Sequence, residues 1–328
     1  MSLVRPPRCW LLAIAACLSL AFGPSPQAKA QSGGLFLLVP FGARAVGGGQ
    51  AVSADTALGV ESLWWNPAGL ARLGKREVAL HHSQTVLANS DMFTVAFPSK
   101  VLGTLAVGGY LVDYGDQQAT DPYSGQPTGV ITNRNYLLTA SYATPVGQRL
   151  NLGVTYKFLM LRFACSGACG ATPVISGQSS ALDVGAQYVL PTTLPISIGA
   201  SVRNLGPALQ VKDRPQADPL PMVVQVGMKA RVPVAALNAL GGTLDASADL
   251  LSASALGGLT AGIGTTLGYK EQLFLRAGYV HQPGEGSGPT LGLGLQRGAF
   301  GFDVARRFDR LAAQLGQPPT YVMLRASF

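Results

Sequence analysis

The chain has 328 residues, of which 48% are hydrophobic and only 12% are charged, against about 25% charged in an average soluble domain. Its formal net charge is +8, yet no block of lysine or arginine stands out, so a nucleic-acid partner is not indicated. After the first residues no apolar run is long enough for a membrane-spanning helix, which leaves a barrel of alternating strands as the fitting class of membrane protein.

Residues 1–30 have the parts of a secretory signal peptide. Two arginines precede an apolar run over Trp10–Phe22, and Ala28-Lys29-Ala30 supplies small residues for a cleavage site. A membrane anchor is one alternative, although a spanning helix needs roughly 20 apolar residues. Lipoprotein processing at Cys17 is another, although the apolar run continues past that cysteine. Cleavage after residue 30 removes three basic residues and no acidic one, so the net charge falls to +5.

Residues 31–75 do not alternate, and they contain many small residues, including Gly47-Gly48-Gly49. Small residues allow close backbone packing, and Asn66-Pro67 is a turn signal. We therefore predict that this segment folds inside a barrel as a plug or hatch. The triple glycine is not a nucleotide-binding loop, because no Lys-Ser/Thr follows it.

From residue 76 onwards apolar and polar residues alternate with a period of two, which predicts strands with one apolar and one polar face. About fourteen such segments are near the 9–11 residues that a tilted membrane strand needs. They lie near 76–86, 88–98, 101–113, 134–145, 149–163, 177–190, 194–204, 219–230, 240–251, 257–270, 272–282, 287–297, 298–308 and 317–328. The predicted fold class is all-β: a transmembrane antiparallel β-barrel of about 14 strands over residues 76–328, with an N-terminal luminal hatch.

The connections between these segments alternate in length. Those after odd-numbered strands include the longer ones, at 114–133, 164–176, 205–218 and 309–316, whereas those after even-numbered strands are mostly short. Long loops outside and short turns in the periplasm are typical of outer-membrane barrels. The stretch 231–239 departs slightly from this pattern.

Charged residues recur on the polar faces of the predicted strands. They include Lys157, Asp183, Arg203, Lys229, Asp245, Asp249 and Arg325. We predict that they line the lumen, because Arg or Lys facing hydrocarbon at the midplane costs roughly 2–4 kcal/mol. A soluble exported β-sandwich remains an alternative, since the same alternation would then turn its apolar face inward.

Catalysis, metals and cofactors have little support in the sequence. Asp245 and Asp249 share one strand face and could in principle perform acid–base chemistry, but polar lumen residues more often line a channel or bind a plug. His81 and His82 are adjacent and so point to opposite faces of a strand. We predict no catalytic residue, no metal site and no cofactor.

Cys165 and Cys169 form an even pair in a chain predicted to be exported. Such a pair suggests a disulfide that closes a small loop. A metal site would need further ligands, and no histidine lies near in sequence.

The last residues, Tyr321–Phe328, alternate strictly and finish on an aromatic residue. Such a strand is typical of the closing strand of a bacterial outer-membrane barrel. Together with the signal peptide and the loop lengths it favours the membrane, with outer-membrane lipid and the barrel-assembly machinery as the expected partners and Phe328 as the terminal signal.

Two segments near the amino end, Gly42–Asp55 and Trp65–Leu70, resemble the signature of the PorV/PorQ family within the FadL-like group of outer-membrane proteins. Arg203–Pro207 and Leu273–Tyr279 resemble later segments of that family. The resemblance implies a fourteen-stranded barrel with a luminal hatch. It also implies that the matching motif, Asn66, Pro67, Ala68 and Gly69, holds or gates the hatch; the alternative is that these residues merely form the turn before the first strand.

The resemblance implies two functions. FadL-like members carry hydrophobic molecules passively across the outer membrane, and this is the function we favour, with a small hydrophobic molecule as the ligand. PorV-like members act with the type IX secretion system, so the alternative is a component or cargo acceptor of such an apparatus. The first function requires an apolar pocket between hatch and wall, and the second a filled lumen with a binding surface on the outer loops.

Overall fold

The structure is a computed structural model that describes residues 34–328 apart from 122, 169–174, 213–214, 216 and 285. The predicted signal peptide and Cys17 lie outside the described residues. Among the described residues, no helix combines the length and the apolarity that crossing a bilayer requires.

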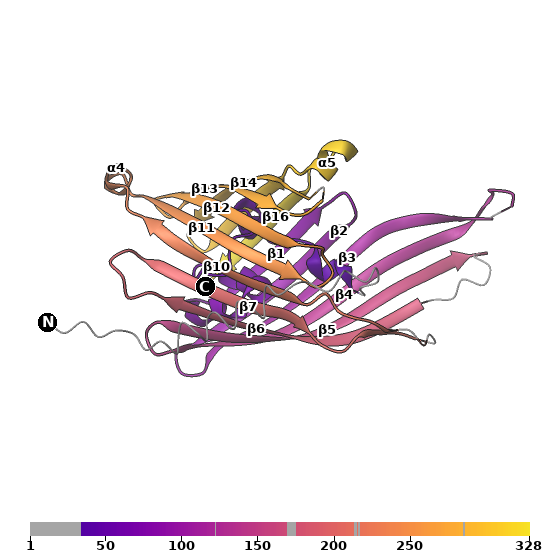
Figure 1. The fold of residues 1–328 in the computed structure, drawn as a ribbon, viewed down its shortest axis with the longest axis horizontal. Coiled ribbons are helices and arrows are strands. Elements are labelled where there is room, and N and C mark those ends of the chain that lie inside the picture. The colour runs from indigo at the N-terminus through magenta and orange to yellow at the C-terminus, as the bar shows by residue number, and fades with distance from the viewer. Residues whose placement is uncertain (1–33, 122, 169–174, 213–214, 216, 285) are drawn as a thin grey trace.

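Fourteen long antiparallel strands form a closed barrel, which confirms the predicted fold class (Figure 1). The sheet closes because β1 pairs with β16 at one seam and β5 pairs with β6 at the other. The wall strands are β1 (Glu77–Gln84), β2 (Asn89–Ser99), β3 (Gly103–Thr120), β4 (Pro127–Val146), β5 (Leu150–Gly167), β6 (Ile175–Val189), β7 (Ile196–Leu205), β10 (Val223–Val232), β11 (Gly242–Ala253), β12 (Leu259–Tyr269), β13 (Leu273–His281), β14 (Gly288–Arg297), β15 (Phe300–Arg307) and β16 (Thr320–Ser327). We call the end where β1 begins and β16 finishes the proximal end, and the opposite end the distal end.

The outer face of the wall is apolar. The exposed side chains include Leu80, Phe93, Leu138, Ile263, Leu275 and Leu291. The residues on either side of each of them in sequence point to the inner face. Period-two alternation produces this arrangement because successive side chains leave a strand on opposite sides. The soluble β-sandwich was therefore the wrong alternative: the strands close on themselves and the apolar faces point out.

Four neighbouring strands, β3 to β6, reach beyond the rest of the barrel at the distal end (Figure 1). The predicted loop 114–133 is thus wrong, because β3 and β4 continue through most of it. After an irregularity at Asp113 and Asp116 their pairing resumes from Asp116↔Thr132 to Thr120↔Pro127. The Arg134 guanidinium lies 2.8 Å from the Asp113 carboxylate and ties the two strands together at that irregularity. Mixed polar residues concealed these strands from a search for alternation.

Other predicted connections also contain structure. The connection 205–218 holds the short strands β8 (Leu209–Val211) and β9 (Ala217–Asp218), which pair with each other, and β8 also pairs with β6. Two short helices occupy further connections: α4 (Ala235–Ala239) between β10 and β11, and α5 (Arg310–Leu315) between β15 and β16.

Residues 34–75, here called the luminal segment, lie within the barrel as a series of short helical turns (indigo in Figure 1). These turns are η1 (Leu35–Leu38), α2 (Ala43–Gly47), η2 (Gly59–Glu61), α3 (Ser62–Trp65) and η3 (Pro67–Arg72). Most of their side chains are buried against the inner face of the wall.

Glycines on both sides bring the luminal segment into backbone contact with the wall. A Cβ atom on Gly264 of β12 would overlap the carbonyl oxygen of Gly48, and one on Gly262 would overlap that of Gly49. Gly49 also has a φ of +68°, a conformation that favours glycine. The triple glycine therefore serves close packing against β12 and its neighbours, where no side chain fits between the two backbones.

Gly264→Ala should loosen this contact, because the new methyl group can be accommodated only by a backbone shift. We expect a cost of roughly 1–3 kcal/mol, as for other overpacked sites. Hydrogen exchange of residues 43–57 should speed up while the barrel stays closed. Gly109→Ala is the matched control, because a Cβ there meets nothing nearer than Leu138 Cδ2 at 3.8 Å. Equal exchange in both variants would contradict the close-packing account.

Candidate functional site

The side chain of Asn66 joins the luminal segment to the wall. Its Nδ2 group donates to the carbonyl oxygens of Ser53 at 2.7 Å, Ala186 of β6 at 3.1 Å and Ala200 of β7 at 3.3 Å. Its Oδ1 atom accepts from the Ala68 backbone N–H at 3.1 Å and so caps η3. A side-chain amide carries both the donors and the acceptor that this arrangement uses.

The other residues of the motif pack around this amide. Pro67 opens η3, where its missing N–H costs nothing. A Cβ atom on Gly153 of β5 would overlap the Pro67 backbone, and one on Gly185 of β6 would overlap Asn66 Oδ1. Asn66-Pro67 therefore forms a turn, and it also packs directly against Gly153 and Gly185 of the wall.

Two of the predicted lumen residues bind the backbone of the luminal segment. Asp249 of β11 accepts hydrogen bonds from the backbone N–H groups of Val52 at 3.1 Å and Ser53 at 2.8 Å. Arg203 of β7 donates to the Trp64 carbonyl at 3.0 Å, and its guanidinium lies 5.3 Å from the centre of the Trp65 ring. Charged wall groups thus satisfy polar backbone groups that no water reaches.

Lys229 of β10 forms an ion pair between the wall and the luminal segment. Its Nζ lies 2.9 Å from Asp55 and 3.3 Å from Asp245. Asp245 also pairs with Arg231 at 2.8 Å. Asp245 and Asp249 are therefore each occupied by different partners and do not act as a carboxylate pair.

Lys157 and Asp183 lie on the inner face without contacting the luminal segment directly. They pair with each other at 2.6 Å and are almost fully buried. Lys157 also donates to Asn204 Oδ1 at 2.8 Å, and the Asn204 N–H donates to Asp183 at 2.8 Å. Asn204 has a φ of +63° near the end of β7, so this cluster fixes the backbone where β7 turns into the following connection.

A row of five apolar or aromatic side chains and one histidine, here called the apolar row, crosses the inner face beside these polar groups. Strand pairing aligns Met323, His81, Met92, Tyr110, Leu137 and Leu159 on six successive strands from β16 to β5. All six are buried. A water-filled channel would present polar side chains here, so this part of the lumen favours apolar contents.

Aromatic rings of the luminal segment pack on that row. The Phe41 ring lies 5.2 Å from Trp64 and 5.6 Å from Tyr110, and Trp64 lies 5.8 Å from Tyr110. Between the rings and the wall is a cavity of about 10 Å³, bordered by Glu61, Trp64, His81, Met92 and Met323 among others. That volume holds about one water molecule.

Glu61, the last residue of η2, is a buried carboxyl group that lies beside the amino end of α2. It accepts a hydrogen bond from the Ala45 N–H at 3.1 Å, and a Cβ on Gly42 would overlap it. Burial raises the pKa of Glu61 to about 7, although the nearby Arg44 guanidinium acts in the opposite direction. The carboxyl therefore changes its charge near neutral pH.

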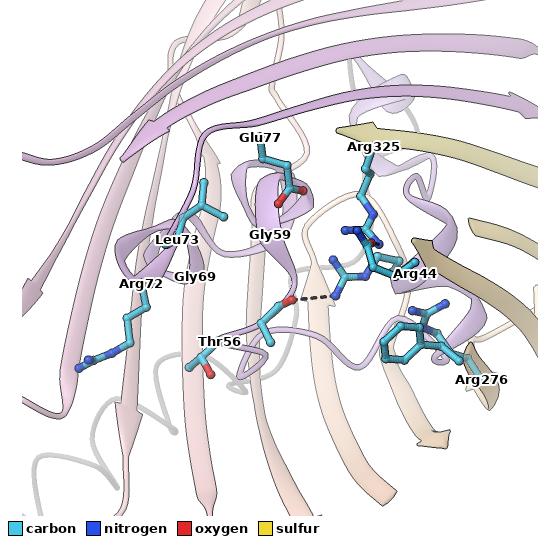
Figure 2. Close-up of a pocket in the computed structure, with 13 residues that line it drawn as sticks. Arg44, Thr56, Gly59, Gly69, Arg72, Leu73, Glu77, Arg276 and Arg325 are labelled. Atoms are coloured by element: carbon cyan, nitrogen blue, oxygen red, sulfur yellow. Dashed lines mark hydrogen bonds between the residues drawn. The ribbon is translucent and has the colours of Figure 1, made fainter. Parts of the chain in front are cut away.

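A larger cavity of about 210 Å³ lies between the luminal segment and the proximal wall (Figure 2). Arg44, Arg276 of β13 and Arg325 of β16 lie near one another on one side of it, with Glu77 on another side. Asp303 of β15 pairs with Arg276 at 2.8 Å and with Arg325 at 3.1 Å.

Alternation alone could have identified more of these groups. Gln187 and Gln225 occupy inner-face positions of their strands, and both donate to luminal backbone carbonyls: Gln187 to Ser53 at 3.0 Å and Gln225 to Gln50 at 3.4 Å. Their positions in the alternation of β6 and β10 predict that both side chains point to the inner face. Nothing in the local sequence marks Glu61 or the arginines of the larger cavity as neighbours, because they come from distant segments.

The remaining predicted residues have separate positions. Cys165 is disulfide-bonded, and its predicted partner Cys169 lies outside the described residues, so the pairing stays a prediction. Phe328 exchanges backbone hydrogen bonds with Arg76 beside the β1–β16 seam. Within the described ranges no group of three or more His, Cys, Asp or Glu side chains is placed to hold a metal ion.

Comparison with solved structures identifies the class of fold. No protein-family model and no curated protein sequence matches the chain. The Ralstonia pickettii toluene transporter TbuX is 14% identical, with a TM-score of 0.55 over 89% of this chain and 100% of that one. A Pseudomonas aeruginosa FadL homologue is 14% identical, with a TM-score of 0.54 over 88% and 98%. The CymD monoaromatic hydrocarbon channel is 12% identical, with a TM-score of 0.56 over 89% and 98%. The chain shares the fold of these FadL-like barrels.

Asn66→Ala should release the luminal segment near η3, because it removes the amide from three carbonyls and one N–H. Each buried group left without a partner costs roughly 1–3 kcal/mol. We expect faster hydrogen exchange over residues 53–70. Asn66→Asp is the sharper variant: it keeps the acceptor for Ala68 but turns a carboxylate oxygen toward carbonyls. Unchanged hydrogen exchange in both variants would contradict the view that the Asn66 amide holds the luminal segment to the wall.

The stability of the luminal segment should depend on pH through Glu61. A folded pKa above the ordinary value means that the contribution is fully present below about pH 4.5 and is lost as the pH rises through about 7. Hydrogen exchange of residues 43–61, corrected for intrinsic rates, should therefore report a stability lower at about pH 8 than at about pH 5 by on the order of 1–3 kcal/mol. Glu61→Gln should remove most of this difference. A pH dependence that survives the substitution would assign it to another group.

Proposed function

We propose that this chain is an outer-membrane channel for passive passage of a small hydrophobic molecule, with the luminal segment as its hatch. The proximal end would face the periplasm and the distal end the exterior, with outer-membrane lipid around the apolar wall. The observation that carries the proposal is the apolar row from Met323 to Leu159, packed against Phe41 and Trp64. Apolar lining on a few rigid strands is what an apolar ligand requires.

Volume supports a gated rather than an open passage. The cavity beside the apolar row has about 10 Å³, whereas a cavity that binds benzene has about 150 Å³. The hatch must therefore shift before a molecule can pass. Its attachment through Asn66, Asp249 and Lys229 uses polar groups that can exchange partners, while the apolar row stays in the wall.

The fold supports the same function. The barrels with this fold include proteins described as toluene transporters and as a monoaromatic hydrocarbon channel. A monoaromatic hydrocarbon is accordingly the first ligand to test. We propose a transport role without an enzymatic one.

The channel is tested by uptake of labelled toluene into cells of a Gram-negative host that lacks its own hydrocarbon channel. Met92→Gln places an amide in the apolar row with little change of volume, and its uptake rate should fall about tenfold, since burying an unpaired amide costs roughly 1–3 kcal/mol. Met92→Leu should retain uptake. A heat-modifiable gel shift verifies assembly of each variant. Uptake that is the same with and without the protein would refute the channel.

A second candidate is a PorV-like component or cargo acceptor of a secretion apparatus. The observation that favours it is the distal extension of β3 to β6, together with the small cavity beside the hatch. Cross-linking of exported proteins to this extension, lost when β3 and β4 are shortened at the Asp113–Asp116 irregularity, combined with no toluene uptake, would favour this candidate over the channel.

A further inference from the structure

The proximal cavity differs in character from the apolar row. It has about 210 Å³, enough for several water molecules at roughly 30 Å³ each, and polar side chains line much of it. Four of them are arginines; Arg72 points away from the other three, which are Arg44, Arg276 and Arg325 (Figure 2). Arg44 belongs to the luminal segment, and the other two belong to the wall. The cavity therefore lies at the contact between the luminal segment and the wall.

These arginines have donors to spare. A guanidinium has five N–H donors, and each of the three uses only one or two of them on protein acceptors. Arg44 donates to the carbonyl oxygens of Leu58 and Ala57, both at 2.7 Å. It forms no ion pair with a carboxylate of the part of the chain that is described.

The acidic groups nearby do not cancel this charge. Asp303 is shared between Arg276 and Arg325, so one carboxylate serves two guanidinium groups. Glu61 lies behind Arg44 and is partly neutral near pH 7, because burial raises its pKa to about 7. Glu77 borders another side of the cavity and accepts a hydrogen bond from the Val60 N–H at 3.3 Å. An excess of positive charge remains where Arg44 approaches the wall.

We propose that this cavity binds one oxyanion, a carboxylate or phosphate group, between Arg44 of the luminal segment and Arg276 and Arg325 of the wall. Guanidinium groups bind such anions through paired, charge-assisted hydrogen bonds. The bound anion offsets the repulsion between the cations of the luminal segment and those of the wall, and it fastens the luminal segment to the wall at the proximal end. This site is independent of the apolar row, and its existence does not rest on the proposed passage of hydrophobic molecules.

The test uses the full detergent-extracted protein and inorganic phosphate as the probe, with binding measured by calorimetry. Gln296→Glu is the principal variant. Gln296 lines the cavity and accepts a hydrogen bond from Arg325 at 3.1 Å, so a carboxylate there supplies the anion internally and loses only the Gln296 hydrogen bond to the Gly298 carbonyl at 3.0 Å. Phosphate binding should weaken about tenfold or more, as expected for a lost charge-assisted interaction. Arg44→Gln should weaken it similarly.

The control is Arg134→Gln, which removes an exposed arginine from the distal extension and should leave phosphate binding unchanged. Hydrogen exchange of residues 43–61 gives a second readout: phosphate should slow it relative to chloride at equal ionic strength. Octyl phosphate distinguishes the source of the anion, because tighter binding than phosphate indicates the head group of an amphiphile and equal binding indicates a free ion. No binding at about 10 mM phosphate, or equal binding by Gln296→Glu and the unaltered protein, would overturn the proposal.

Discussion

The structure depends on placing an irregular backbone inside a closed barrel where little water can reach it. A segment of short turns has many peptide groups without partners in its own helices, and each one left unpaired in the interior costs free energy. The wall supplies those partners. Asp249 of the wall takes two N–H groups and Arg203 of the wall takes a carbonyl, whereas Asn66 of the luminal segment reaches two wall carbonyls and that of Ser53. The luminal segment is thus held by hydrogen bonds to specific wall residues as much as by apolar packing.

Close approach makes those hydrogen bonds possible. Where the two backbones meet at β12, both sides carry glycine, as at Gly48 and Gly264. Glycine in a strand weakens the strand itself, since it adds flexibility and no side-chain packing. In β12 this loss of strand stability is offset by close packing against the luminal segment. Glycines also leave the register of a strand weakly specified by the sequence. In β12 these glycines are the ones that let the luminal segment approach the wall closely.

The lumen divides by chemistry along and around the barrel. The apolar row that includes Tyr110 and Leu137 meets aromatic rings, whereas the proximal junction around Arg44 and Arg276 is strongly charged. Polar groups such as Asn66 and Asp249 join the luminal segment to the wall, and such groups can exchange hydrogen-bond partners.

The barrel follows from the sequence, because alternation with period two fixes which face of each strand is apolar. The same alternation puts Asp249 and Arg203 on the inner face. Prediction from the sequence failed where that pattern is interrupted: the distal parts of β3 and β4 appeared to be a loop because their pairing, rather than their hydropathy, makes them strands. Which luminal groups meet depends on the folded barrel as a whole. Arg44 and Arg325 are brought together by closure of the wall around the luminal segment, a long-range effect that no local pattern encodes.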